Sequence, residues 1–453
     1  MQKLLVANRG EIAVRIIRTA KEMGISTVAV CSEADVDSLA VRLADEHVVL
    51  GPPPAQQSYL NQEAVLDAAK RTGADAVHPG FGFLSENAGF ARAVVDAGLI
   101  WVGPSAEVIN LMGDKVAALR AAKAAGVPVL AGTDGPLDVD GDPLQVARGI
   151  GFPLMTKASA GGGGRGIRVV RSEDEFLGAL DQASAEAKAA FGDGTIYLER
   201  FVEHARHVEV QILGDGTSFI HLGDRDCSMQ RRSQKVMEEA PAPELPDHVR
   251  ETIRRSSVSL AAECGYTGVG TVEFLYDPAR QEAAFIEMNT RLQVEHPVTE
   301  MITGIDLVEQ QLRVASGEPL ALRQQDIRFE GHAFECRINA ENPAMNFFPS
   351  PGTISKLEWP SGEGVRIDTG VEQGSDVVPF YDSMIAKLVV HAPSREEALE
   401  RLAKALDEIE VEGIATTVPL HRTLARLPEL AEVAHHTTFI ENTPEILNAL
   451  EKA

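Results

Sequence analysis

The stretch TVEFLYDPARQEAAFIEMNTRLQVEH, from Thr271 to His296, decides how the chain around it is organised. In its second half every second residue is polar, and these residues are Glu287, Asn289, Arg291, Gln293 and Glu295. A period of two places all of them on one face of an extended segment, whereas a helical period would scatter them around an axis. We therefore expect an extended chain with one polar face from Glu287 to Glu295.

The first half of the stretch predicts a hairpin. Thr271–Tyr276 is typical of a strand, Asp277-Pro278 opens a turn, and Ala284–Met288 is typical of the returning strand. If Leu275 pairs with Phe285, the register places Glu273 directly opposite Glu287.

Two facing carboxylates about 5 Å apart repel by roughly 3 kcal/mol at an effective dielectric near 20. A divalent cation would offset this repulsion. Glu273, Glu287 and the side-chain carbonyl of Asn289 suit Mg²⁺ shared with phosphate oxygens, and Arg291 and Glu295 would then supply an anion anchor and a base. The alternative is an amphipathic edge strand whose polar side is only solvated.

The composition excludes several classes of protein. The chain has 453 residues, is 44% hydrophobic and carries a net charge of −25, so it is long enough for two or three domains and unsuited to nucleic acid. The cysteines lie far apart without CxxC spacing, which is typical of thiols in a reducing cytoplasm: Cys31, Cys227, Cys264 and Cys336. We expect a cytoplasmic protein with no membrane segment, since neither a signal-peptide pattern nor a long apolar run is found.

The residue composition and the pattern of predicted helices and strands change twice along the chain. Residues 1–112 alternate short apolar runs with helical patterns, which predicts a doubly wound parallel sheet. A linker rich in Gly, Asp and Pro follows from Gly132 to Pro143. From about Glu330 short strands with Pro/Gly turns predict a third, α+β unit.

Two further segments leave alternatives open. The glycine-rich loop in Phe152–Val170 joins two predicted strands, so it is either a flap over phosphates or a surface loop, and Lys115 and Lys157 favour the flap. The basic run in Arg225–Pro243 is either solvated or the anion pocket of an acidic protein.

These features together resemble the ATP-grasp proteins, and specific motifs resemble the biotin carboxylases of acetyl-CoA carboxylase and related biotin-dependent enzymes. The motifs occur in the expected order from Lys3 to about Leu447: ANRGEIA, HPGFGFLSEN, MGDK, KASAGGGGRG, RDCSMQRR, EMNTRLQVEHPVTEM, ECRINAE and PFYDSMIAKL. The resemblance implies a parallel-sheet N-terminal domain at 1–112, an ATP-grasp domain at 113–329 with a lid at about 132–203, and a C-terminal α+β domain at 330–453.

The resemblance also implies a role for individual residues. The ATP contacts would be Lys115, Lys157, Gly163, Gly164, Glu199, Arg200, Val202, His207, Gln230, Ser233 and Leu275. The metal ligands would be Glu273, Glu287 and Asn289, holding two Mg²⁺ (or Mn²⁺) ions. Bicarbonate would lie against Lys235, Arg291, Gln293 and the Val294 backbone, with Glu295 as general base and Arg337 against the biotin ureido oxygen.

The implied reaction is ATP-dependent carboxylation of biotin by bicarbonate through carboxyphosphate, the first half-reaction of an acyl-CoA carboxylase. Biotin would arrive on a separate biotin carboxyl carrier protein or domain, since the chain has no Met-Lys-Met motif, and a carboxyltransferase and a second copy in a homodimer are the other implied partners. The chain departs from the family pattern at Ser233, where His is common, at Ala160 in the flap, and at Phe81, where Tyr is common. The alternatives are a carbamoyl-phosphate-type synthase and a catalytically silent ATP-binding subunit.

Overall fold

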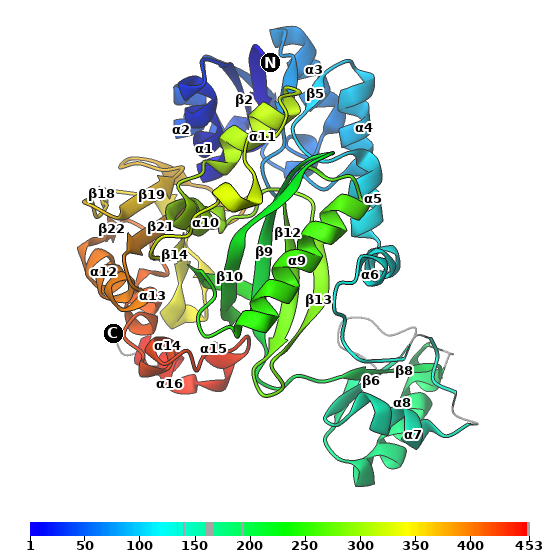
Figure 1. Cartoon of the computed structure of the whole chain (residues 1–453). Helices are drawn as coiled ribbons and strands as arrows, with labels where there is room; N and C mark the ends of the chain where they lie inside the picture. The colour runs from blue at the N-terminus through cyan, green and yellow to red at the C-terminus, as the bar shows by residue number, and fades with distance from the viewer. Residues whose placement is uncertain (134, 139–140, 159–166, 192–193, 451–453) are drawn as a thin grey trace.

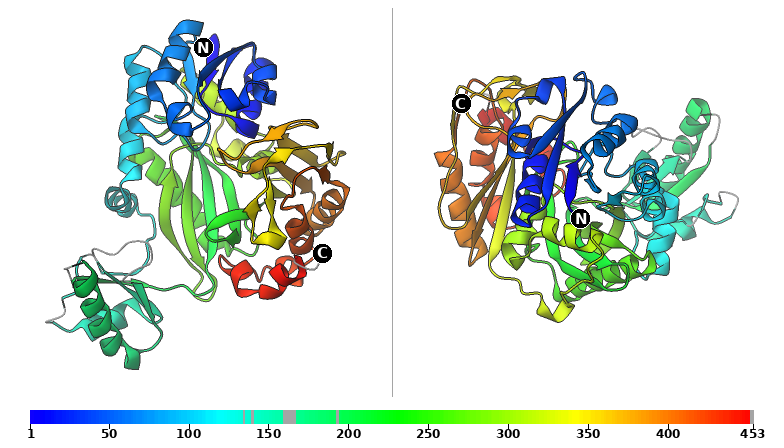
Figure 2. Two further views of the ribbon diagram at one scale, coloured as in Figure 1. Left: turned by 180° about the vertical axis from the view of Figure 1, so that it is seen from behind. Right: turned by 90° about the horizontal axis from the view of Figure 1, so that it is seen from above.

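The computed structural model describes residues 1–133, 135–138, 141–158, 167–191 and 194–450. Figure 1 shows an N-terminal α/β layer, a long twisted sheet below it, and a small lobe that stands apart from the rest of the molecule. The views from behind and from above in Figure 2 show the same separation of the small lobe.

The N-terminal layer is a parallel sheet in the order β3-β2-β1-β4-β5 within the described residues. Its strands are β1 (Lys3–Val6), β2 (Ser26–Ser32), β3 (Glu46–Gly51), β4 (Ala76–His78) and β5 (Ile100–Trp101), and its helices are α1 (Gly10–Glu22), α2 (Leu39–Leu43), α3 (Gln62–Thr72), α4 (Ala88–Asp96) and α5 (Ala106–Gly113). Leu4 and Val6 of β1 join one buried cluster and Leu5 joins another, so the strand is covered on both faces. The doubly wound parallel sheet predicted for this region is confirmed.

The long sheet is antiparallel and has the order β13-β12-β9-β10-β11-β14-β21-β19 in the part of the chain that is described. Its strands are β9 (Arg206–Asp215), β10 (Phe219–Arg231), β11 (Gln234–Ala240), β12 (Thr267–Asp277), β13 (Glu282–Asn289), β14 (His332–Asn339), β19 (Val365–Thr369) and β21 (Met384–Ala392). Val208, Val210 and Ile212 of β9 pack with α9 (Asp247–Glu263) in one buried cluster. The alternate residues of β9 therefore face the other side of the sheet.

The predicted hairpin is present, with one correction to its register. Glu273 pairs with Glu287 as expected, but Leu275 pairs with Ala284 and Phe274 with Phe285. A β-bulge between the Glu273–Glu287 pair and the Phe274–Phe285 pair leaves Ile286 as the extra residue. The assumed pairing of Leu275 with Phe285 is therefore wrong.

The extended segment predicted from Glu287 to Glu295 is also shorter than expected. Strand β13 ends at Asn289, and Glu295 is the N-cap residue of α10 (His296–Thr303), whose first turn contains Pro297. A proline preorganised for the first helical turn favours the helix, and the polar residues after Asn289 reach the site through an irregular turn.

The small lobe has its own sheet and core. Strands β6 (Leu154–Ala158), β7 (Ile167–Val170) and β8 (Ile196–Arg200) lie in the order β7-β6-β8, beside α7 (Pro143–Ile150) and α8 (Glu173–Phe191). Helix α6 (Lys115–Ala124) precedes the lobe in the chain. The predicted flap contacts Gly163 and Gly164, and the departure at Ala160, lie outside the described residues.

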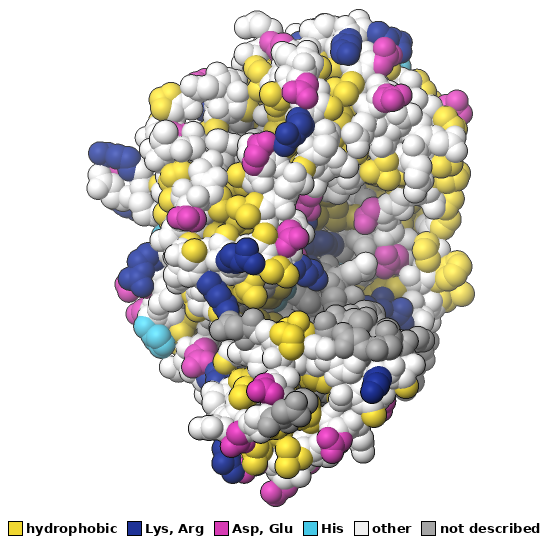
Figure 3. Space-filling model, turned by 90° about the vertical axis from the view of Figure 1, so that its right-hand side faces the viewer, with side chains coloured by type: hydrophobic (Ala, Val, Ile, Leu, Met, Phe, Trp, Pro, Cys, Tyr) yellow, Lys and Arg dark blue, Asp and Glu magenta, His cyan; other side chains and the backbone are white. Residues whose placement is uncertain are grey.

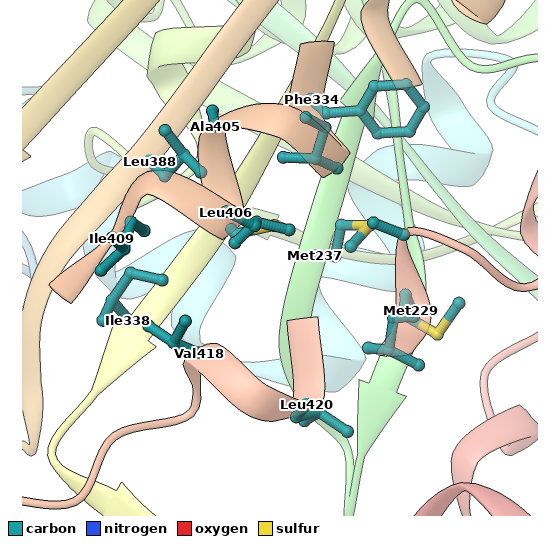
Figure 4. Close-up of a cluster of buried hydrophobic side chains, with 14 of the residues drawn as sticks. Met229, Met237, Phe334, Ile338, Leu388, Ala405, Leu406, Ile409, Val418 and Leu420 are labelled. Atoms are coloured by element: carbon teal, nitrogen blue, oxygen red, sulfur yellow. The ribbon is translucent and has the colours of Figure 1, made fainter. Parts of the chain in front are cut away.

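The C-terminal region continues the long sheet through the pairing of β11 with β14. Its remaining elements are β15 (Glu341–Asn342), β16 (Phe348–Pro349), β17 (Gly352–Thr353), β18 (Lys356–Glu358), β20 (Asp376–Val377), β22 (Glu410–Glu412), α12 (Arg395–Glu408), α13 (Val418–Leu424), α14 (Pro428–Ala431), α15 (Phe439–Asn442) and α16 (Pro444–Leu450). Helix α11 (Leu307–Ala315) precedes this region and packs with α1 in one buried cluster. Figure 4 shows how Phe334, Ile338 and Leu388 of the sheet pack against Leu406 and Leu420 of the helices. Among the described residues, no helix has both the length and the hydropathy needed to cross a bilayer.

Candidate active site

A cavity of about 1010 Å³ lies where the N-terminal layer, the long sheet and the C-terminal region meet. It is lined by residues from all three parts, including Arg9, Phe81 and Tyr381. The residues predicted from sequence that line it are His207, Gln230, Ser233, Lys235, Glu273, Glu287, Asn289, Arg291, Gln293, Val294, Glu295 and Arg337. The surface viewed in Figure 3 is hollowed near its middle, with basic side chains in and around the hollow.

Glu295 lies between two cations on the cavity wall. Its Oε1 accepts from Lys235 Nζ at 2.6 Å, and its Oε2 accepts from Arg337 Nη2 at 2.9 Å. Burial raises the pKa of Glu295, but Lys235, Arg337 and Arg225 together hold it well below its usual range. Glu295 is therefore an ionised carboxylate whose proton affinity is set by these neighbours.

Glu273 is surrounded by donors. Its carboxylate lies 3.1 Å from Lys235 Nζ and 2.9 Å from His207 Nε2, and it accepts from Asn289 Nδ2 at 2.8 Å and from Gln293 Nε2 at 2.7 Å. Although burial raises its pKa, Lys235 and His207 hold the pKa of Glu273 below its usual value. The polar face predicted from the sequence is thus assembled around this carboxylate.

Glu287 is the less satisfied member of the acidic pair. Its side chain is exposed and lines the cavity. Partial burial raises its pKa, and repulsion from Glu273 and Glu86 raises it further. This is the repulsion that a cation between the two strands would relieve.

The donor set fits a hard divalent ion. Carboxylates of Glu273 and Glu287 and the Asn289 amide oxygen are the ligand types that Mg²⁺ and Mn²⁺ take. Asn289 Oδ1 accepts from Arg291 Nη2 at 3.1 Å, so ligation by this oxygen would replace the contact to Arg291.

The basic run divides into buried and surface cations. Arg225 is fully buried, and its guanidinium donates to Glu209 Oε1 at 2.5 Å and to Gln293 Oε1 at 2.8 Å. Lys235 lies 2.7 Å from the other Glu209 oxygen. Arg231 instead stacks on Phe347 near the surface. The run is therefore divided between buried cations that contact Glu209 and charge near the surface.

Sequence reasoning missed two glutamates that pair with cations of the large cavity. Glu209 shares its face of β9 with His207, and a period-two reading of HVEVQI would have found it. Glu86 accepts from Arg291 Nε at 2.9 Å and comes from a loop of the N-terminal layer far away in the sequence. No local pattern identifies that pair.

Several residues assigned to nucleotide binding lie at a different cavity, of about 440 Å³, between the small lobe and the long sheet. Glu199, Arg200, Val202 and Leu275 line it. The Arg200 guanidinium donates to the Ile150 carbonyl at 2.9 Å and to Glu282 at 2.7 Å, so its side chain supports the base of the lobe.

The lysines assigned to phosphates come from different elements. Lys157 of β6 donates to Glu199 at 2.6 Å, whereas Lys115 begins α6 and is exposed. Lys115 nonetheless lowers the pKa of Glu287, which places its charge near the acidic pair.

This geometry, a small α/β lobe beside an antiparallel sheet with an acidic hairpin, is that of an ATP-grasp enzyme. Residues 1–109 match the family described as biotin carboxylase, N-terminal domain, and residues 335–442 match the biotin carboxylase C-terminal domain. Residues 114–323 match the ATP-binding domain of the carbamoyl-phosphate synthase L chain. The chain belongs to the biotin carboxylase family.

Individual relatives agree with this assignment over nearly the whole chain. A biotin carboxylase of Haemophilus influenzae is 54% identical over 426 residues, which is 94% of each chain. The biotin carboxylase domain of a thermophilic 2-oxoglutarate carboxylase superposes with a TM-score of 0.94 at 46% identity, covering 98% of this chain and 99% of the other. A biotin carboxylase domain dimer of Hydrogenobacter thermophilus 2-oxoglutarate carboxylase, described in complex with MgADP, ADP and bicarbonate, has a TM-score of 0.84 at 46% identity and covers 98% of each chain.

Proposed function

We propose that this chain carboxylates a ureido nitrogen of biotin with bicarbonate, consuming ATP through carboxyphosphate. The observation that carries the proposal is the buried Glu295 carboxylate held between Lys235 and Arg337 on the wall of the large cavity. A base between two cations suits a reaction that binds an anion, removes its proton and then polarises a carbonyl oxygen.

In this proposal, Lys235, Arg291, Gln293 and the Val294 backbone hold bicarbonate. Glu295 takes the proton of bicarbonate while a bicarbonate oxygen attacks the γ-phosphorus of ATP. This step releases ADP and forms carboxyphosphate. Bicarbonate draws Lys235 away from Glu295, which raises the pKa of that carboxyl and makes it a stronger base.

Carboxyphosphate then breaks down to CO₂ and phosphate in the closed cavity. The phosphate removes the proton from the ureido nitrogen, and Arg337 donates to the ureido oxygen as negative charge develops there. The nitrogen attacks CO₂ and forms the new C–N bond. Exclusion of water protects carboxyphosphate from hydrolysis.

Glu273, Glu287 and Asn289 would hold the divalent metal ions. Bound there, Mg²⁺ or Mn²⁺ would screen the phosphate charge against which bicarbonate attacks. The chain's own contribution is to place these oxygen donors on facing strands, which Gln293 and His207 support from the sides.

In this proposal, ATP is contacted by residues of the small lobe, the long sheet and the glycine-rich segment. These residues are Lys115, Lys157, Gly163, Gly164, Glu199, Arg200, Val202, His207, Gln230, Ser233 and Leu275. The described members of this set line one or the other of two cavities, except Lys115 and Lys157, and we propose that the lid at about 132–203 closes to bring all of them together. The domain boundaries that accompany this lid are 1–112, 113–329 and 330–453.

The partners in this proposal are a biotin carboxyl carrier protein or domain, a carboxyltransferase that selects the final acceptor, and a second copy of the chain. The Hydrogenobacter thermophilus relative is described as a dimer, which supports the homodimer. A reducing, cytoplasmic location accords with its free cysteines.

Phosphate release from ATP tests the proposal, measured with and without bicarbonate, free biotin and ammonia. Stimulation by biotin in the presence of bicarbonate is the expected result. Turnover that depends on ammonia would replace the proposal with a carbamoyl-phosphate-type synthase, and absence of turnover with ATP still bound would replace it with a silent subunit. The matches at both ends of the chain to biotin carboxylase domains favour the first outcome.

A further inference from the structure

Two glutamates face each other in the strand pair that carries Arg337. Glu238 of β11 is directly opposite Glu335 of β14, and the residues are 1% and 0% exposed. Directly opposite residues share a face of the sheet, with Cβ atoms about 5 Å apart. The two side chains are therefore neighbours on a part of the sheet that water does not reach.

The hydrogen bonds of these carboxyl groups are incomplete. Arg337 Nε donates to Glu238 Oε1 at 2.6 Å. The other oxygen of Glu238 and both oxygens of Glu335 have no hydrogen-bond partner in the described part of the chain. Buried carboxylate oxygens without donors are costly, whereas a protonated carboxyl group is itself a donor. One proton on the pair supplies a donor that is otherwise missing.

The surrounding cations are committed to other carboxylates. Lys235 lies within 3.1 Å of Glu209, Glu273 and Glu295. Lys387 donates to the Val294 carbonyl and lies 3.1 Å from Glu11. The charged and titratable groups around the pair are Cys227 on β10, Lys235 on β11, Cys336 and Arg337 on β14, Lys387 on β21, Glu11 on α1 and Glu295 at the start of α10.

These surroundings favour the neutral form of at least one member. Burial raises the pKa of Glu335 well above its usual value, and the charge of Glu238 raises it further despite Lys387. Burial likewise raises the pKa of Glu238 to about 7, with Arg337 opposing the shift. Two carboxyl groups this close share their titration.

We propose that Glu238 and Glu335 hold one proton between them at neutral pH and that this half-protonated pair positions Arg337 for the biotin step. Glu238 is a positioning residue, since it acts on biotin only through the Arg337 guanidinium. Loss of the shared proton places a second negative charge behind Arg337, which draws the guanidinium away from the cavity. The inference rests on the proposed function where it concerns biotin.

A measurement of stability tests the shared proton without any assay of turnover. Glu335→Gln keeps the shape and neutrality of a protonated carboxyl group and cannot ionise. A raised pKa in the folded state means that the contribution of Glu335 to stability is present at low pH and is lost as pH rises through the folded-state value. The melting temperature of Glu335→Gln should therefore rise relative to the parent chain between about pH 6 and about pH 9.

Glu239→Gln is the matched control, because Glu239 is the next residue on β11, is 2% exposed and pairs with His332 and Arg395. Burial raises the pKa of Glu239, but these partners hold it below its usual value. Its replacement should lower the melting temperature at both pH values, since this carboxylate is ionised throughout and loses its salt bridge to Arg395. A Glu335→Gln variant that behaves as Glu239→Gln does would overturn the shared proton.

Kinetics test the positioning of Arg337. Glu238→Gln should raise the KM for free biotin by about tenfold, the usual effect of losing one charge-assisted hydrogen bond, with the KM for ATP within about twofold of the parent. In the parent chain, the KM for biotin should rise above about pH 8, because the pair loses its shared proton. In Glu335→Gln this rise should be absent. An equal rise in both KM values in Glu238→Gln would show a general structural role and reject the positioning. If the parent chain shows no biotin-dependent turnover, the proposed function fails, and the melting experiment still decides the proton.

Discussion

Glu295→Gln gives the sharpest test of the proposed base. The substitution keeps the size of the side chain and removes its charge and its ability to accept the bicarbonate proton. Loss of a general base costs about 10²–10⁴ in turnover, equivalent to about 3–5 kcal/mol of transition-state stabilisation. Biotin-dependent phosphate release should fall by this factor.

The cost to stability should be smaller. Removing one partner of a buried ion pair costs about 3–5 kcal/mol when it leaves a cation alone. Here Lys235 keeps Glu209 and Glu273, and Arg337 keeps Glu238 at 2.6 Å. We expect a loss of about 1–3 kcal/mol, which leaves the chain folded.

Glu300→Gln is the control for this variant. Glu300 is a buried residue of the same helix with two cationic partners, Arg15 at 2.8 Å and Arg366 at 2.7 Å, and it does not line the large cavity. Steady-state phosphate release and equilibrium binding of ATP should be measured on both variants. Retention of biotin-dependent turnover in Glu295→Gln, or an equal loss in Glu300→Gln, would refute the assignment of the base, as would a collapse of ATP affinity.

Other predictions concern the metal ligands, the anion anchor and the core. Glu287→Gln should raise the Mg²⁺ concentration for half-maximal turnover by about tenfold, because one charged ligand is lost; an equal shift in the exposed Glu251→Gln on α9 would contradict this. Arg291→Ala should lower bicarbonate-dependent turnover by about 10²–10³ with ATP still bound, and Glu86→Gln, which weakens one contact of Arg291, should cost less than about tenfold. If Glu86→Gln costs as much as Arg291→Ala, the orientation of the guanidinium matters more than its charge. Leu406→Ala, in the fully buried cluster of Figure 4, should cost about 2–5 kcal/mol in urea unfolding with turnover per folded molecule unchanged. Loss of turnover in folded protein would connect that core to the site.

The acidic hairpin shows where reasoning from the sequence succeeds and where it stops. Alternation identified the polar residues, and the pairing of Glu273 with Glu287 is as predicted. The bulge at Ile286 was not predicted, since register arithmetic assumes one residue opposite one residue. Both Ile286 and Glu287 are exposed, so the bulge affects the direction of the glutamate that we propose as a metal ligand.

Contacts between segments that are distant in the sequence were also not predicted. Arg225 lies in a charged run that usually faces solvent, yet it is fully buried among side chains of β9, β12 and α10. Nothing within the run distinguishes Arg225 from the surface residue Arg231. The difference arises because Arg225 contacts Glu209 and Gln293, which are distant in the sequence. The local sequence does not contain that information.

The same contacts explain how a chain with a net charge of −25 can bind anions. Each cation that lines the large cavity is held by a carboxylate: Arg9 by Asp35, Lys235 by Glu209, Arg291 by Glu86 and Arg337 by Glu238. A buried cation needs a carboxylate nearby to stay charged, and a carboxylate behind it directs its remaining donors forward. Glu273 accepts from Lys235 and Glu295 accepts from Arg337. An anion that enters the cavity competes with these carboxylates for donors already in place, so acidic residues build the anion site instead of opposing it.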